Sequence, residues 1–216
     1  MSVREYFIGV DLGQVRDHTA IAVVERTDIR LPERDWVTWE FVHETRSYLR
    51  HLDRVVLGTS YPDVVRIVCD AVADVERFGP CTLVVDATGV GAPVVDLLRE
   101  AGLRARLVAV TITGADGVSR RSNGDWLVPK RDLVTGLQLM LQQEELRIAS
   151  GLRAGDVLVK ELREMRVKVG VSGHENFEAW RSGAHDDLVL ATALACWRCR
   201  LRIPSMWGTR RLGGPF

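Results

Sequence analysis

The chain has 216 residues, of which 46% are hydrophobic and 27% are charged, and its formal net charge is zero. This size and composition are ordinary for one α/β domain, and no apolar run approaches the roughly 20 residues that a membrane helix needs. The N-terminus has no signal-peptide pattern, so we expect a cytoplasmic protein with no membrane partner. A neutral bulk charge neither favours nor excludes nucleic acid, so the local charge distribution has to decide.

Three antiparallel strands are predicted at the start of the chain, followed by a helix. The strands are expected over residues 6–11, 19–25 and 36–45, with a hairpin loop over 13–18. The segment 46–59 is ambiguous. Pro62 favours a helix that begins after Ser60 or Tyr61 and ends before Pro80.

The rest of the chain alternates strands and helices. We expect strands over 82–85, 106–112 and 166–171, the last paired with 177–180, and helices over 91–101, 130–143, 156–165 and 186–201. A mobile loop is expected over 114–125. This order predicts an α/β fold whose mixed central sheet has three antiparallel strands followed by parallel strands, flanked by helices. We expect one domain over 1–202 and a loose basic tail over 203–216.

Carboxylates occur at three distant places where a predicted strand ends or a helix begins. Asp11 ends the first strand, Asp86 ends the fourth, and Asp186 and Asp187 open the last helix. The first and fourth strands should lie side by side in parallel, so these acids would meet at one edge of the sheet. Gathered carboxylates repel each other unless a divalent cation lies among them, which predicts a site for Mg²⁺ or Mn²⁺, with two ions, for phosphodiester hydrolysis. Alternatively, Asp186 serves only as a helix cap.

Three neighbouring residues are minor candidates for the same site. Thr88 and Gly89 lie in a glycine-containing turn that lacks both the Walker A lysine and the full dinucleotide-binding fingerprint. A phosphate contact and a purely structural tight turn are both open for this turn. His185 could assist a water molecule, contact DNA or make only a structural hydrogen bond.

Basic residues gather away from these acids. Arg120, Arg121, Lys130 and Arg131 flank the loop over 114–125, and we expect them to contact DNA phosphates, although solvated surface charge is the alternative. Five arginines and no acid occur from residue 196 to the end of the sequence. In that stretch Cys196 and Cys199 have zinc-like spacing, but their helical context favours ordinary buried thiols.

These motifs resemble the nuclease domain of the large terminase subunit of tailed bacteriophages, a member of the RNase H-like superfamily. The resemblance spans residues 7–201 and rests on the segments 9–13, 85–91, 128–133, 179–181 and 183–191. It implies an RNase H-like fold and a metal-dependent endonuclease that cuts concatemeric double-stranded DNA for packaging, in the host cytoplasm if the protein is viral. It also implies catalytic acids at Asp11, at Asp86 and at the pair Asp186 and Asp187. The implied partners are double-stranded DNA, a packaging ATPase, a portal protein and a small terminase subunit.

The sequence departs from that family in one respect. It has no Walker A motif, and its first predicted strand begins a few residues after Met1. We therefore expect a nuclease without the packaging ATPase domain, either a separately expressed domain or a stand-alone relative. The alternatives are a Holliday-junction resolvase-like nuclease, an actin-like or sugar-kinase-like ATPase, and a non-catalytic DNA-binding assembly module. The short chain argues against the ATPase, and the four aspartates argue against the non-catalytic module.

Overall fold

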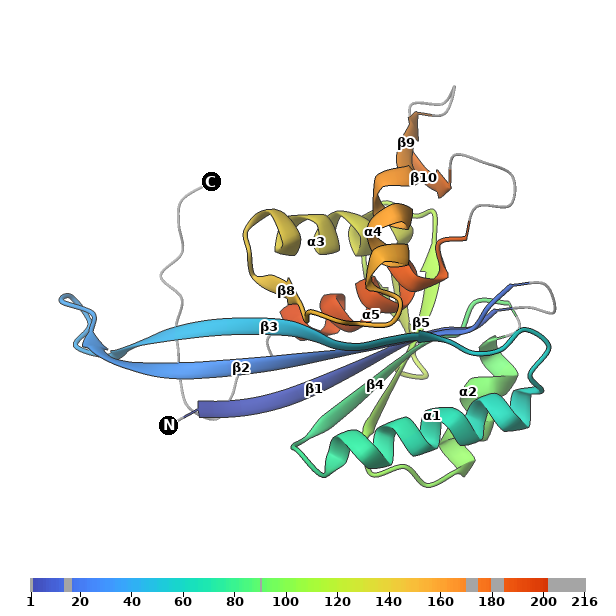
Figure 1. The fold of residues 1–216 in the computed structure, drawn as a ribbon, viewed down its shortest axis with the longest axis horizontal. Helices are drawn as coiled ribbons and strands as arrows, with labels where there is room; N and C mark the ends of the chain where they lie inside the picture. The colour runs from blue at the N-terminus through green and yellow to red at the C-terminus, as the bar shows by residue number, and fades with distance from the viewer. Residues whose placement is uncertain (1, 14–16, 90, 170–174, 180–184, 202–216) are drawn as a thin grey trace.

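The fold is built on one eight-stranded mixed sheet with helices on both faces (Figure 1). The computed structural model describes residues 2–13, 17–89, 91–169, 175–179 and 185–201. Within these residues, no helix is both long enough and apolar enough to cross a membrane. The predicted α/β class with a mixed sheet is confirmed.

The strands of the large sheet lie in the order β6-β7-β5-β4-β1-β2-β3-β8, and β10 and β9 form a separate pair. The strands are β1 Ser2–Asp11, β2 Ala20–Arg34, β3 Phe41–Arg54, β4 Cys81–Asp86, β5 Arg106–Thr113, β6 Ser119–Arg120, β7 Trp126–Pro129, β8 Leu146–Ile148, β9 Met165–Val169 and β10 Glu175–Ala179. The helices are α1 Tyr61–Glu76, α2 Gly91–Glu100, α3 Lys130–Gln142, α4 Gly155–Glu164 and α5 Asp187–Arg200. As predicted, β1 to β3 are antiparallel and β4 pairs with β1 in parallel.

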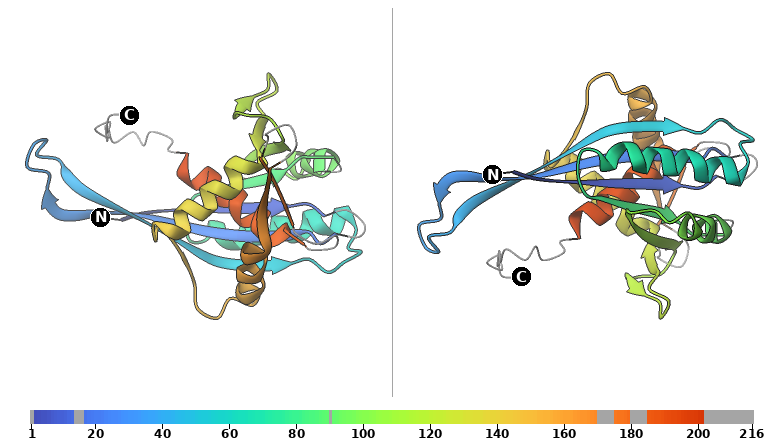
Figure 2. Two further views of the ribbon diagram at one scale, coloured as in Figure 1. Left: turned by 90° about the horizontal axis from the view of Figure 1, so that it is seen from above. Right: turned by 90° about the horizontal axis from the view of Figure 1, so that it is seen from below.

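Side-chain alternation in the central strands decides which layer each residue faces. Phe7 and Val84 belong to the core beneath α3, α4 and α5, whereas Ile8 belongs to the core beneath α1 and α2. Because the side-chain period of a strand is two, Asp11 shares the face of Phe7, and Asp86 shares the face of Val84. Both acids therefore face the layer that contains α5, which lies between the sheet and α3 in Figure 1. Helices α1 and α2 lie on the opposite face, which is nearest the viewer in the right-hand view of Figure 2.

Helix α5 is buried over nearly its whole length, as expected for a helix that is apolar on every side. It approaches the sheet closely at Gly9, where an added Cβ would lie 2.0 Å from the carbonyl oxygen of Ala191 and 2.8 Å from the nitrogen of Ala195. The backbones of β1 and α5 are therefore in direct contact. This contact fixes the start of α5 relative to the end of β1.

The strands β2 and β3 are longer than predicted and extend past the core as an arm (Figure 1). The prediction of a strand over 36–45 is wrong in its first half, because residues 36–38 form the turn of this hairpin. The carboxylate of Asp35 shapes the turn by accepting hydrogen bonds from the backbone nitrogens of Val37 (2.9 Å) and Thr38 (2.8 Å). Most of the ambiguous segment 46–59 is strand β3.

Smaller elements complete the comparison with the sequence. The loop expected over 114–125 contains the short strand β6, and β8 was not predicted. The predicted pairing of β9 with β10 and the cap of α1 at Ser60 are both confirmed. Several predicted features lie outside the described residues: the hairpin-loop residues 14–16, residue 90, the strand ends 170–171 and 180, the motif residues 181, 183 and 184, and the tail over 203–216.

The contact at Gly9 yields a stability prediction. Gly9→Ala should lower the free energy of unfolding by about 3 kcal/mol or more, because the new methyl group has to push the backbone of α5 away from the sheet. Urea unfolding followed by circular dichroism measures this loss. Gly114→Ala is the matched control, since nothing lies within 4 Å of its added Cβ. Equal stability of the two variants would contradict the close packing of β1 on α5.

Candidate metal centre

Asp11 and Asp86 lie side by side at the end of neighbouring strands. The parallel register of β1 and β4 pairs Val10 with Val85, so the two aspartates that follow occupy adjacent positions at the sheet edge. Burial raises the pKa of Asp11 well above its ordinary value of 3.8, and the charges of Asp86, Asp186 and Asp187 raise it further. The structure thus brings Asp86, Asp186 and Asp187 within electrostatic reach of Asp11.

Asp86 is held in place by the turn that follows it. Its carboxylate accepts hydrogen bonds from the backbone nitrogen of Thr88 (2.8 Å) and from the Thr88 hydroxyl, and that hydroxyl in turn accepts one from the backbone nitrogen of Ile112 (2.9 Å). Burial raises the pKa of Asp86, while the bonds from Thr88 and a hydrogen bond with Asp11 oppose the rise. Gly89 has a φ of +58°, which accounts for a glycine in this tight turn.

Asp186 stands at the N-cap position of α5, but its side chain makes no cap hydrogen bond. Instead, its Oδ2 accepts a hydrogen bond of 2.6 Å from Nζ of Lys130, the first residue of α3. The charge of Lys130 also lowers the pKa of Asp11. Capping alone therefore does not account for Asp186, and Lys130, predicted as a DNA contact, belongs to the surroundings of the acids.

Asp187 is buried and doubly bonded by one arginine. Arg54, the last residue of β3, donates from Nε to Oδ2 (2.6 Å) and from Nη2 to Oδ1 (3.0 Å) of Asp187, and it also binds Glu161 of α4. Burial and the charge of Asp187 raise the pKa of Glu161 from 4.5 to about 7, and Arg54 opposes this rise. His185 is exposed, with its Nδ1 4.0 Å from Oδ1 of Asp187.

The sequence analysis did not identify Arg54 and Glu161. Arg54 lies in the segment left ambiguous, and no local pattern marks a residue that acts on a partner 133 positions away. Glu161 did leave a signal, because it lies three residues after the buried Leu158 and so on the apolar face of α4. A carboxylate on such a face calls for a buried cation.

The donor set fits a hard divalent cation. Asp11 and Asp86 form no ion pair within the part of the chain that the structure describes, although burial raises the pKa of both and the charge of Asp86 raises that of Asp11 further. A divalent cation relieves this condition, and carboxylate oxygens are the ligands that Mg²⁺ and Mn²⁺ prefer. In the described ranges, no group of three or more His, Cys, Asp or Glu side chains is arranged around a metal position. Asp186 and Asp187 are bonded instead to Lys130 and Arg54.

The two cysteines with zinc-like spacing, Cys196 and Cys199, are buried free thiols. Burial raises the pKa of the Cys199 thiol to about 11 and that of Cys196 well above its ordinary value, so both thiols stay protonated at neutral pH. Zinc requires thiolate ligands. The expectation of ordinary buried thiols accords with these positions.

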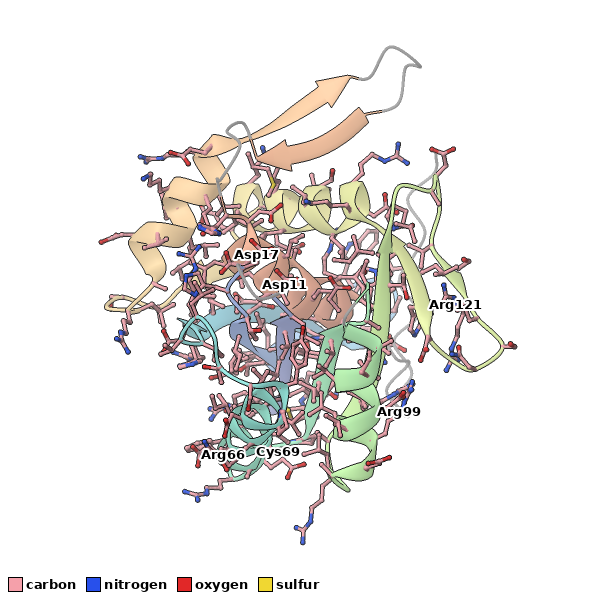
Figure 3. The ribbon with its side chains drawn as sticks, turned by 90° about the vertical axis from the view of Figure 1, so that its right-hand side faces the viewer. Asp11, Asp17, Arg66, Cys69, Arg99 and Arg121 are labelled. Carbon is pink, nitrogen blue, oxygen red and sulfur yellow. The ribbon has the colours of Figure 1, made fainter. Side chains whose placement is uncertain are left out.

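The other predicted DNA contacts lie outside the acid cluster. Arg121 is exposed, and Figure 3 shows it well apart from Asp11. Arg120 donates from Nε to the carbonyl oxygen of Gly124 (2.9 Å), and Arg131 donates to the carbonyl oxygen of Asp116 (3.3 Å). A role of these arginines in DNA binding stays a prediction.

The buried bonds of Arg54 yield a second stability prediction. Arg54→Met should lower the free energy of unfolding at pH 8 by roughly 3–5 kcal/mol, because it leaves the carboxylates of Asp187 and Glu161 buried without a cation. Chemical unfolding at pH 8 measures the change. Arg153→Met is the control, since Arg153 is exposed and reaches Asp53 only at 3.7 Å. A loss no larger than that of the control would show that Arg54 does not support the acids.

The chain matches the Terminase RNaseH-like domain family over residues 8–197. No match was found among curated proteins. Two similar solved structures are the large terminase nuclease of thermophilic phage G20c with bound magnesium and the nuclease domain of the large terminase subunit gp2 of bacterial virus Sf6. The G20c nuclease has 21% identity and a TM-score of 0.60, and the match covers 90% of this chain and 82% of that chain. The Sf6 domain has 14% identity and a TM-score of 0.56, and the match covers 90% of this chain and 87% of that chain.

The large terminase of bacteriophage HK97 is also similar, at 12% identity and a TM-score of 0.51. There the match covers 90% of this chain but only 39% of the HK97 chain. At these identities the structural likeness establishes the fold, and the family match establishes the relationship. The chain belongs to the Terminase RNaseH-like domain family, and its fold is that of the phage large terminase nuclease domains.

Proposed function

We propose that this protein is a metal-dependent endonuclease that hydrolyses phosphodiester bonds of double-stranded DNA during viral genome packaging. The observation that carries the proposal is the strand register that places Asp11 beside Asp86 in a terminase nuclease fold, with Asp186 and Asp187 within electrostatic reach of Asp11. Support for the metal comes from the G20c nuclease, which is described with bound magnesium, and from a variant of the Sf6 nuclease domain described with manganese.

The side chains present suggest how the site works. Asp11, Asp86 and Asp186 would hold the cation, and two bound ions would supply an activated water and stabilise the leaving oxygen. Thr88 fixes the carboxylate of Asp86 for this role. Arg54 keeps Asp187 in place beneath the site through its two bonds.

The alternatives differ in substrate or in activity. A resolvase-like nuclease would prefer branched over linear DNA, an ATPase would bind ATP without cutting DNA, and an assembly module would bind DNA only. Membership of the terminase family favours cutting of linear duplex DNA. The proposal implies that the protein acts in the cytoplasm of a host cell. Its proposed partners there are a packaging ATPase, a portal protein and a small terminase subunit.

Plasmid digestion tests the acids directly. Asp11→Asn and Asp86→Asn should each lower the cleavage rate in Mg²⁺ or Mn²⁺ by about 100-fold or more, because each removes a charged ligand. In EDTA both variants should melt at the same temperature as wild type or higher, since the raised pKa of each acid marks an unfavourable charge at neutral pH. This gain should shrink as the pH falls and the wild-type carboxyls take up protons.

Asp96→Asn is the control for both readouts. Asp96 is exposed on α2 and paired with Arg99. Full metal-dependent activity of Asp86→Asn would remove that residue from the site. Cutting of plasmid in EDTA by the wild type would refute the metal requirement itself.

Duplex binding tests the arginine contacts. Arg121→Ala should weaken binding of a linear duplex in EDTA, and it should reduce the slope of log K against log salt by about 1, as expected for one lost phosphate contact. Fluorescence anisotropy across a salt series measures both quantities. Arg66→Ala, an exposed arginine on α1 (Figure 3), is the control. An unchanged slope would refute a phosphate contact of Arg121.

A further inference from the structure

One arginine of α5 is buried without a partner. Arg198 is 6% exposed, and its Nε is buried with no hydrogen-bond partner. Within the described ranges, the guanidinium of Arg198 makes no ion pair and no hydrogen bond. Buried arginines are almost always paired, and an orphaned buried donor costs free energy. The structure therefore calls for an acceptor at this position.

A neighbouring arginine illustrates the usual arrangement. Arg26, on β2, donates from Nη1 to the carbonyl oxygen of Cys199 (3.0 Å) and forms an ion pair with Asp28 at 2.8 Å. The guanidinium of Arg26 thus has partners within the chain, and one of them, Cys199, is the residue that follows Arg198. The orphaned state of Arg198 is therefore not a general feature of this end of the helix.

Two other arginines, Arg106 and Arg120, act electrostatically on Arg198. Trp197 lies edge-to-face against Trp126, with ring centroids 5.5 Å apart, and the guanidinium of Arg120 lies 5.4 Å from the Trp126 ring centroid. Arg106, at the start of β5, is exposed. Burial lowers the pKa of Arg198, and the charges of Arg106 and Arg120 lower it further. Arg106 and Arg120 thus lie near enough for their charges to act on Arg198.

Among the described residues, no carboxylate forms an ion pair with Arg198. Glu5 is the one acid that raises the pKa of Arg198, and it forms no ion pair with it among the described residues. The sequence after α5, residues 202–216, contains no Asp or Glu. An anion that completes this cluster has to come from outside the described part of the chain.

We propose that Arg198, Arg106 and Arg120 form a phosphate-binding site at the C-terminal end of α5. A guanidinium presents donors in a fork that matches phosphate oxygens. Arg120 lies over the ring of Trp126, which packs against Trp197, the neighbour of Arg198 in the sequence. The site is separate from the acids, because the 11 residues from Asp187 to Arg198 correspond to about 16 Å of helix. The phosphate comes either from the backbone of duplex DNA, which rests on the proposed nuclease function, or from free inorganic phosphate.

The first experiment is thermal unfolding of the full chain in EDTA, in sodium phosphate and in sodium chloride of equal ionic strength. Phosphate should raise the melting temperature of the wild type above its value in chloride, because binding to the folded state stabilises it. Arg198→Met should lose this phosphate-specific shift and should melt at the same temperature or higher in chloride, since it removes an unpaired buried charge. Arg66→Met, with the same loss of charge on α1, should retain the shift.

The second experiment distinguishes the two sources of phosphate. If the ligand is the DNA backbone, Arg198→Met should weaken duplex binding in EDTA about five- to tenfold and reduce the salt slope by about 1. Loss of the phosphate shift with unchanged duplex binding would assign the site to free phosphate. Neither readout involves cleavage, so a failed nuclease assay would leave both interpretable.

Two results would overturn the site. One is a wild type that melts identically in phosphate and chloride while Arg198→Met binds duplex normally. The other is Arg198→Met that folds but melts far below wild type in chloride with the phosphate shift intact, as a purely structural arginine would. If the Arg198→Met variant does not fold, the same measurements are made on the Arg106→Gln variant, because Arg106 is exposed. This variant should reduce the phosphate shift and raise the melting temperature in chloride, and an unchanged shift would equally overturn the proposal.

Discussion

The register between β1 and β4 places the carboxylates of Asp11 and Asp86 side by side. The surrounding residues reduce the repulsion between these two carboxylates. Once Val10 pairs with Val85, Asp11 and Asp86 cannot separate without breaking the centre of the sheet. Burial makes their charges more costly than they would be in water. Hydrogen bonds from Thr88 and the nearby charge of Lys130 offset part of this cost. What they leave uncompensated is the electrostatic driving force for a divalent cation.

The two acids at the start of α5 are not equivalent. Both carboxylate oxygens of Asp187 accept hydrogen bonds from the planar guanidinium of Arg54. The same guanidinium forms an ion pair with Glu161 of α4. Asp186 is more exposed and has one oxygen bonded to the flexible side chain of Lys130. A cation can displace a single lysine contact more readily than a bidentate buried one. On the proposed function, Asp186 would therefore be the better ligand, and Asp187 the better anchor for the start of α5.

Local patterns in the sequence were enough to place the acids but not the residues that support them. Apolar runs ending in Asp11 and Asp86 define strand ends, and strand periodicity then assigns both to one face. The prediction of a strand from residue 36 was wrong because Trp36 and its neighbours have a strand-like composition. The hydrogen bonds that the Asp35 carboxylate accepts from the backbone fold these residues into a turn instead. Arg54 could not be assigned, since its importance arises only when β3, α4 and α5 pack together.

Helix α5 carries side chains of opposite charge near its two ends. Its N-terminus carries a partial positive charge that favours Asp187, and its C-terminus carries a partial negative charge that favours Arg198. One buried helix therefore presents acids at one end of the sheet and an arginine at the other, separated by about 16 Å. Close backbone packing at Gly9 keeps this spacing fixed relative to the strands. The zero net charge of the chain is therefore compatible with a local separation of charge along this helix.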